Sequence, residues 1–253
     1  MAKMVRTAGV KLVKYAFTLA ETLITLGIIG IVAAMTIPNL ITEHQKRTTV
    51  TKLQRAISVL NQAYRLAYDD VGEASAEEAF NMGSEEYFNT YWAPYIKVLT
   101  YCSSYDVCGY DSNKPFILID GSNDSIRVEW DGYRTTFLTM DGFLYQIWTG
   151  QGSGKKDSEG NEGTVKSNWV TVDINGGAGP NRYGRDVFFL KRVEGSDIVE
   201  GGAGIQPYGY DATDKTIKSY CSSSASGDNR RGYYCLEKIR RAGWKIEKDY
   251  PWN

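Results

Sequence analysis

An apolar run near the N-terminus constrains the fold of this chain more than any other feature. The 25 residues from Phe17 to Ile41 contain one charged side chain, Glu21. At a rise of about 1.5 Å per residue, a helix of this length crosses a bilayer core of about 30 Å. We therefore expect a membrane-spanning helix. A short basic segment without acids precedes it and contains Lys3, Arg6, Lys11 and Lys14.

Glu21 is the exception within this run. A carboxylate inside a spanning helix costs about 2.5–3.5 kcal/mol on insertion scales, so it normally has a partner and a role. Two simpler interpretations remain open. Glu21 is tolerated because it lies near the helix end, or the run is a secretory signal peptide that is cleaved near Ala34. Charge alone does not determine the orientation, because four basic residues also follow the run, namely Lys46, Arg47, Lys52 and Arg55.

The spacing of four residues carries a family resemblance. Ala16 is a small residue at the end of the basic leader, Phe17 follows it, Glu21 is fifth from Phe17, and Pro38 is twenty-second. This arrangement resembles the N-terminal signature of type IV pilins and type II secretion pseudopilins, although the family usually has Gly where Ala16 stands. The resemblance implies cleavage between Ala16 and Phe17 by a prepilin peptidase, N-methylation of Phe17, and a helix kink at Pro38.

In that family the helix packs with its neighbours in the core of a filament. The cationic amino terminus of Phe17 in one subunit would pair with Glu21 of an adjacent subunit, which relieves the desolvation cost of both charges and sets the subunit register. The implied partners are other copies and related pilin subunits, the prepilin peptidase, the inner-membrane assembly platform with its ATPase, and the lipid bilayer. The implied location is the bacterial inner membrane, crossed once with the N-terminus in the cytoplasm, and then an extracytoplasmic filament.

Beyond Pro38 the apolar residues narrow to one stripe with helical spacing. Steps of three and four residues separate Val50, Leu53, Ile57, Leu60, Tyr64, Ala67 and Val71. This pattern predicts that the helix continues to about Asp70, before Gly72, and buries the stripe against a globular head. The expected domains are a leader at 1–16, a transmembrane or filament-core helix at 17–41, an amphipathic continuation at 42–71, and the head at 72–253.

The head is expected to be an α+β domain. Ser75 and Ser84 are predicted N-caps of short helices, and another short helix is predicted at 233–242. The Gly-rich polar stretch 150–166 is predicted to be a surface loop. A long helix packed on an antiparallel sheet is the layout that pilins and pseudopilins share. Alternating patterns and Asp-Gly turns predict strands at 115–120, 125–130, 133–140, 143–148, 169–174 and 186–192.

Four cysteines lie in two close pairs, Cys102 with Cys108 and Cys221 with Cys235. The even number, the closeness within each pair and an exported domain favour two local disulfides, although three connectivities are possible. The rival interpretation, a zinc site with four thiolates, lacks the usual C-x₂-C spacing. The second pair resembles the disulfide-bounded C-terminal loop of many pilins.

The sequence contains little that predicts catalysis. Its single histidine, His44, follows the membrane segment, and without a second histidine the usual triads and zinc hydrolase sites cannot form. The stretch 150–156 lacks the G-x₄-G-K-[ST] spacing of a phosphate loop. The net charge of −1 becomes more negative without the leader, which argues against a general nucleic-acid-binding surface. We therefore expect a protein that is not an enzyme.

The stretch from Asp173 to Asp186 contains a candidate calcium site. Asp173, Asn175 and Asp186, with carbonyls of the glycine-rich turn between them, are oxygen ligands of the kind that calcium prefers. Some pseudopilins hold calcium in such a loop, but the stretch lacks the EF-hand pattern, and an Asx-stabilised turn explains it equally well. No other cofactor is expected.

The function that the resemblance implies is mechanical. The chain would be a structural subunit of a type IV pilus or a type II secretion pseudopilus, polymerised through its N-terminal helix. The alternative is a membrane-tethered binding module that does not polymerise and that captures a ligand, a surface polymer or DNA. The peptidase site discriminates between them, because a plain anchor needs neither Phe17 nor Glu21.

Overall fold

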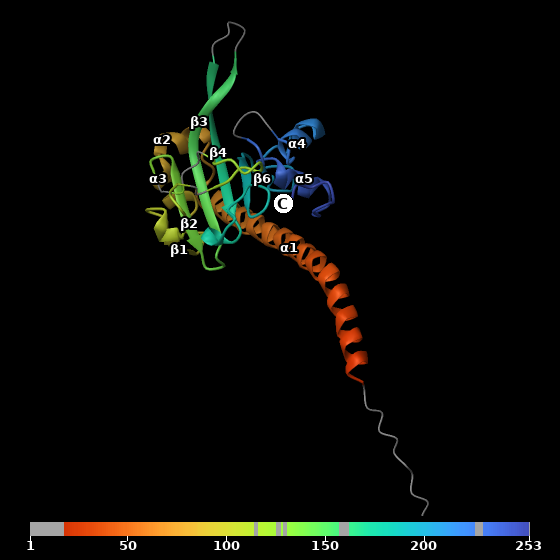
Figure 1. Cartoon of the computed structure of the whole chain (residues 1–253). Helices are drawn as coiled ribbons and strands as arrows, with labels where there is room; N and C mark the ends of the chain where they lie inside the picture. Colours follow the sequence, from red (N-terminus) through yellow and green to blue (C-terminus); the bar gives the residue numbers. More distant parts are fainter. Residues whose placement is uncertain are drawn as a thin grey trace, which may run out of the picture. The chain divides into compact units, whose positions relative to one another are not determined.

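The computed structural model describes residues 18–113, 116–124, 128, 131–156, 162–225 and 230–252 (Figure 1). The chain divides into two compact units, residues 1–45 and 46–253, which are described separately. The helices are α1 (Leu19–Val71), α2 (Ala76–Met82), α3 (Ser84–Tyr91), α4 (Asp214–Tyr220) and α5 (Cys235–Arg241). The strands are β1 (Val98–Tyr101), β2 (Arg134–Thr139), β3 (Leu144–Lys156), β4 (Glu162–Asp173), β5 (Val187–Val193) and β6 (Gly204–Pro207).

The first unit contains the N-terminal half of α1, with Pro38 inside the helix. By length and composition, α1 is long and apolar enough to cross a membrane, with a mean hydropathy of 2.1 in its most apolar stretch. A helix of this kind near the N-terminus serves as a membrane span or as a signal sequence. The predicted leader, with Ala16 and Phe17, lies outside the described residues.

In the second unit, the remaining half of α1 is the amphipathic segment that the sequence predicts. Most of the predicted stripe is buried, and Ala56 and Ala63, which the prediction left out, are buried with it. Val71 at the helix end is 45% exposed, so the stripe stops one turn earlier than expected. The helix ends at Val71 as predicted, because Gly72 adopts a φ of 83°, which terminates the helix and favours glycine.

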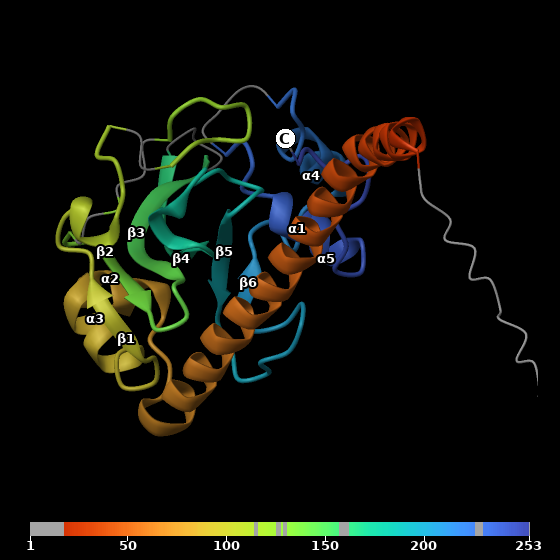
Figure 2. The same ribbon diagram turned by 60° about the horizontal axis from the view of Figure 1, so that its bottom comes forward.

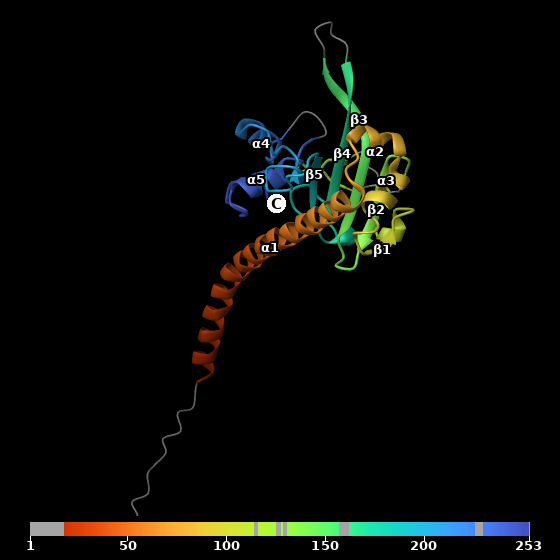
Figure 3. The same cartoon turned by 180° about the vertical axis from the view of Figure 1, so that it is seen from behind.

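The sheet has six antiparallel strands in the order β1-β2-β3-β4-β5-β6, so each strand pairs with its neighbours in sequence. Both of its faces are covered. In β5, Phe188 and Leu190 pack with the α1 stripe, whereas Val187 and Phe189 belong to a second cluster on the other face. Figure 2 shows this half of α1 running diagonally past β6. Figures 1 and 3 show α2 and α3 beside β1 to β3, and α4 and α5 beside β5 and β6.

The predicted surface loop at 150–166 is wrong for the described residues. β3 and β4 pair with each other beyond the rest of the sheet, and the ribbon that they form projects past the other strands (Figure 1). Alternating apolar residues mark only strands with one buried face, so a two-stranded ribbon outside the sheet carries no such signal. Gly150 is required where the ribbon begins, because a Cβ there would lie 1.8 Å from Trp148 Cζ2.

Four of the six predicted strands are confirmed, as β2, β3, β4 and β5. The strand predicted at 115–120 is wrong for residues 116–120, where Ile117 makes only isolated bridges to Asn123 and Arg182. The strand predicted at 125–130 lies outside the described residues except for Val128. The sequence reasoning missed α4. It also missed the edge strands β1 and β6, because four-residue strands are too short to show an alternating pattern.

The local signals of the short helices are confirmed in part. Ser75 caps α2 in a capping box with Glu78. Ser84 is the first residue of α3 rather than its cap, which is Gly83, and the Ser84 hydroxyl donates instead to the carbonyl oxygen of Asp131. Both predicted disulfides are confirmed, Cys102–Cys108 and Cys221–Cys235, and this pairing excludes the four-thiolate zinc site.

Candidate functional site

Glu21 lies in the first turn of α1, where sequence reasoning assigned it a role in assembly. Within the described residues its carboxylate bonds only to Thr18, whose backbone nitrogen and hydroxyl both donate to Glu21 Oε2 at 2.8 Å. The Thr18 hydroxyl in turn accepts from the Glu21 backbone nitrogen at 3.2 Å. This reciprocal arrangement is a capping box, so Glu21 caps its own helix.

The surroundings of Glu21 are exposed and apolar. In this segment the helix carries large apolar side chains on every side. A single helix cannot bury its own side chains, so they remain exposed. The hydroxyls of the threonines in this segment donate hydrogen bonds to backbone carbonyls of the same helix, as Thr25 does to Glu21 O at 2.6 Å. The side chains that are 50% to 78% exposed are Leu19, Leu23, Ile24, Leu26, Ile28, Ile29, Ile31, Val32, Met35, Ile37, Leu40 and Ile41.

The three predicted calcium ligands come together at the end of β4 and the start of β5. Asp173 Oδ2 accepts from the Tyr110 hydroxyl at 2.8 Å, and Asp173 Oδ1 accepts from the Asn175 backbone nitrogen at 3.1 Å. The Asp186 carboxylate accepts from the backbone nitrogens of Asn181 and Arg182, at 3.0 and 2.6 Å. Both carboxylates therefore stabilise the turn between the strands, as in an Asx-type turn.

Burial perturbs both acids. The pKa of Asp173 lies well above its usual value, first because the side chain is fully buried and second because Asp186 is nearby. Burial also raises the pKa of Asp186, although hydrogen bonds from Arg182 and Asn181 oppose this effect. Two negative charges close together in an apolar setting are unfavourable, so the site favours a state in which one charge is neutralised.

The fit to calcium rests on one further atom. Asn175 Oδ1 is buried and has no hydrogen-bond partner among the described residues, while Asn175 Nδ2 donates to Gly179 O at 2.9 Å. A cation bound to Asn175 Oδ1 would give this oxygen a partner and would also offset the negative charge of the two buried carboxylates. A proton on Asp173 would offset the negative charge but would leave the Asn175 oxygen without a partner. Among the described residues there is no group of three or more His, Cys, Asp or Glu side chains that could hold a metal ion. Calcium would thus depend on the amide and on backbone oxygens.

Calcium is expected to raise the melting temperature of the detergent-solubilised chain above its value in chelator, by binding only the folded turn. Thermal unfolding followed by circular dichroism measures this effect, with magnesium as the control because it prefers a tighter octahedral site. The Asn175→Ala variant should lose the difference. Equal melting temperatures in calcium and chelator would refute the calcium prediction.

Replacing Asp173 by Asn is expected to flatten the dependence of stability on pH. Because the folded pKa of Asp173 is raised, its contribution to stability is full below the unfolded value of about 3.9 and is lost as the pH rises through the folded pKa. In chelator, the variant should therefore become progressively more stable relative to the wild type as the pH rises from 4 to 8, because Asn cannot ionise. Urea unfolding at each pH measures this. Parallel curves for the two proteins would contradict it.

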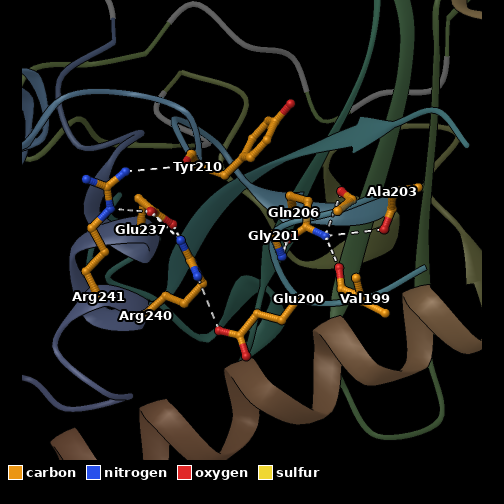
Figure 4. A network of polar contacts seen from close by, with 10 residues as sticks. Val199, Glu200, Gly201, Ala203, Gln206, Tyr210, Glu237, Arg240 and Arg241 are labelled. Atoms are coloured by element: carbon orange, nitrogen blue, oxygen red, sulfur yellow. Dashed lines mark hydrogen bonds and ion pairs between the residues drawn. The ribbon is translucent and has the colours of Figure 1, made fainter. Parts of the chain in front are cut away.

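A second group of charges, which sequence reasoning missed, joins α5 to two loops (Figure 4). Glu237 is fully buried, and its carboxylate accepts from Arg240 at 2.7 Å and from Arg241 Nε at 2.6 Å. Arg241 also donates to Tyr210 O and Ala212 O, at 3.1 and 2.8 Å. Arg240 reaches Glu200 in the loop before β6 at 3.3 Å. The spacing of an acid with arginines three and four residues later was the available signal.

The same loop is held from β6. Gln206 Nε2 donates to the carbonyl oxygen of Val199 at 2.7 Å, and Gln206 Oε1 accepts from the Gly201 backbone nitrogen at 3.0 Å (Figure 4). Gln206 is buried, so these bonds also satisfy its amide. The loop between β5 and β6 is therefore tied to the sheet and to α5 by polar contacts.

A third buried charge, Arg192 on β5, connects the helices to the sheet. Its guanidinium lies over the rings of Tyr64 and Tyr87, 5.9 Å from each centroid. The guanidinium lies 3.9 Å from Glu73 Oε1. With the Asn168 amide oriented so that its oxygen faces Arg192, Arg192 donates to Asn168 Oδ1 from NH2 at 2.6 Å and from Nε at 2.9 Å. Glu73 also accepts from the Tyr64 hydroxyl and from the Gly195 backbone nitrogen.

Comparison with known proteins identifies one family. The model of a family described as a family of unknown function, DUF6613, matches residues 39–253. This match covers the head and the part of α1 that packs on it, and it begins one residue after Pro38. Neither the curated proteins nor the solved structures include a match to this chain.

Proposed function

We propose that this chain, a member of the family of unknown function DUF6613, is a structural subunit of a filament of the type IV pilus or type II secretion pseudopilus kind. In this proposal a prepilin peptidase cleaves it between Ala16 and Phe17, Phe17 is N-methylated, and α1 enters the filament core. Before assembly, the same helix anchors the subunit in the bacterial inner membrane.

One observation carries the proposal, namely an apolar helix that exposes large side chains on every side from Leu19 to Ile41. An apolar surface of this extent is unstable in water, so it requires either lipid or other protein helices. A filament core supplies the second environment after the bilayer has supplied the first. The head contributes the second half of α1, which is packed against the sheet and links the polymerising segment to the outer domain.

The proposal assigns Glu21 to subunit register. In a single chain its carboxylate caps its own helix through Thr18. In the filament, Glu21 would pair with the methylated amino terminus of Phe17 in a neighbouring subunit, because each of these charges lacks water in an apolar core. Extraction of the subunit from the bilayer would need the work of an assembly ATPase in the inner-membrane platform.

Replacing Glu21 by Ala is expected to lower filament incorporation by about tenfold or more, since an unpaired buried amine costs several kcal/mol. Electron microscopy and the ratio of sheared filament to membrane-bound chain measure this. Glu21→Gln is the matched control, because it keeps an acceptor for Thr18 but loses the charge. If Gln assembles like the wild type, Glu21 acts only as a helix cap and the register role is refuted.

Intact mass and N-terminal peptide mass of the chain from its native membranes separate the proposal from its alternative. A mature chain that starts at N-methylated Phe17 supports a filament subunit. A chain that keeps its leader supports a membrane-tethered binding module, and a cut near Ala34 supports a signal peptide. Either of the last two results overturns the proposed function.

A further inference from the structure

The charges of the head are divided by sign along the chain. Residues 66–96 contain seven Asp and Glu and no basic residue, whereas residues 214–253 contain nine Lys and Arg against five acids. The first segment includes α2 and α3, and the second includes α4 and α5. The two segments lie on opposite sides of the head, beside β1 to β3 and beside β5 and β6 (Figures 1 and 3).

The acidic surface is made of four exposed carboxylates that form no ion pair within the described part of the chain, Asp69, Glu77, Glu85 and Glu86. The other acids of this segment have partners inside the head. Glu78 caps α2 through Ser75, Glu73 lies against Arg192, and Asp70 accepts from the Tyr95 hydroxyl at 2.7 Å. The four remaining charges therefore face solvent without compensation.

The basic lobe carries the opposite charges around a hollow. The hollow has a volume of about 280 Å³ and lies between α4, α5 and the C-terminal segment, with Lys218 and Lys245 in its wall. Two of the three acids in its wall are already paired, since Asp249 bonds Lys238 at 2.9 Å and Asp214 bonds Arg241 at 2.7 Å, and the third, Glu247, is exposed. The basic lobe is defined by its four exposed lysines without ion pairs in the described chain, Lys215, Lys218, Lys245 and Lys248.

We propose that the basic lobe of one copy docks against the acidic surface of the next copy. The inference rests on the proposed function and adds to it a contact between heads. A second copy fits because it presents four exposed carboxylates to four exposed lysines, and none of these eight side chains forms an ion pair within the described residues. The lysines outnumber Glu247, the exposed acid in the wall of the hollow. Since the two surfaces lie on opposite sides of one head, the contact is heterologous and leaves a free surface at each end, which builds an open chain rather than a closed dimer.

Zero-length crosslinking of filaments tests the contact directly. A copy with Lys215, Lys218, Lys245 and Lys248 replaced by Arg keeps its charge but has no reactive amine in the basic lobe. In the same copy, Lys97→Arg changes the mass of the tryptic peptide that carries the acidic surface, so that the peptide from this copy can be recognised. When it is expressed together with the wild type and treated with carbodiimide, the marked acidic peptide should link to Lys218 or Lys245, which must belong to another copy. Filaments in which this link is absent overturn the contact.

Charge reversal supplies the second test. Lys218→Glu with Lys245→Glu, or Glu85→Lys with Glu86→Lys, should each lower filament yield roughly tenfold, because attraction becomes like-charge repulsion. All four changes in one chain should restore the yield to within about twofold. Lys97→Glu is the control for a single charge reversal and should assemble normally, because Lys97 lies outside the basic lobe.

The two proposals fail differently. A wild-type chain that forms no filament overturns the proposed function and the contact with it. Filaments that tolerate each reversal, or that the fourfold reversal does not rescue, overturn only the contact. Non-reducing mass spectrometry of the membrane pool verifies that both disulfides form in each variant, so that misfolding is recognised as the cause of any loss.

Discussion

Replacing Glu237 by Ala is expected to lower the free energy of unfolding by about 3–5 kcal/mol, the usual cost of removing one partner from a buried ion pair. The variant leaves Arg240 and Arg241, whose side chains are only partly exposed, without the buried carboxylate that accepts from both. It also loosens the contacts of Arg241 with the segment before α4. For a chain of this size, the melting temperature should fall by about 10 °C.

Thermal unfolding followed by circular dichroism measures this loss, and limited proteolysis locates it. Cleavage should increase first between β6 and α5, where the network holds the chain. Asp214→Ala is the matched control, because its carboxylate bonds the same Arg241 at 2.7 Å but is 80% exposed, and such pairs contribute about 1 kcal/mol or less. Similar melting temperatures for the two variants would refute the role of the buried network.

Replacing Arg192 by Met is expected to lower the free energy of unfolding by about 3 kcal/mol, because this change also removes one partner from a buried ion pair. The guanidinium compensates Glu73, bonds Asn168 on β4, and lies over two tyrosine rings. Met fills a similar volume but leaves the Glu73 carboxylate beside an apolar side chain. The pKa values of Tyr64 and Tyr87 are raised by burial and lowered by Arg192, so both should rise further in the variant.

Urea unfolding measures the loss, and a double-variant cycle assigns it. If the charge of Glu73 is the reason, then Glu73→Gln together with Arg192→Met should cost clearly less than the sum of the two single changes. Lys191→Met on the same strand is the control, and should have little effect because Lys191 is partly exposed and forms no ion pair in the described chain. Additive losses would show that Arg192 does not act by compensating the charge of Glu73.

Local signals account for the parts of the fold that were predicted correctly. The α1 stripe was visible because buried positions recur every three or four residues, and the helix end was visible at Gly72. The disulfides were favoured by the short separation within each pair. Ala56 and Ala63 were missed because alanine is neutral in such a pattern, yet each is almost completely buried under the sheet.

The missed strands lacked a local signal. The β3–β4 ribbon is polar and glycine-rich, and its strands pair with each other through backbone groups that every residue carries. The edge strands β1 and β6 are four residues long and are defined by the neighbour that they join. The candidate calcium residues were found as a set, but their hydrogen bonds were not foreseeable from spacing, nor was a buried Asn175 oxygen that has no partner in the described part of the chain.

The amino-acid sequence by itself determined that this chain has one long apolar helix with a carboxylate in its first turn, a head of mixed α and β structure, and two local disulfides. These features depend on residues that are close in sequence. Only the tertiary structure decided which charges are compensated. Arg192 meets Glu73 and Arg241 meets Asp214 from distant segments, whereas Lys218, Lys245, Glu85 and Glu86 remain exposed. Pairing of charges depends on distance in space and on exclusion of water, and neither is encoded by local spacing.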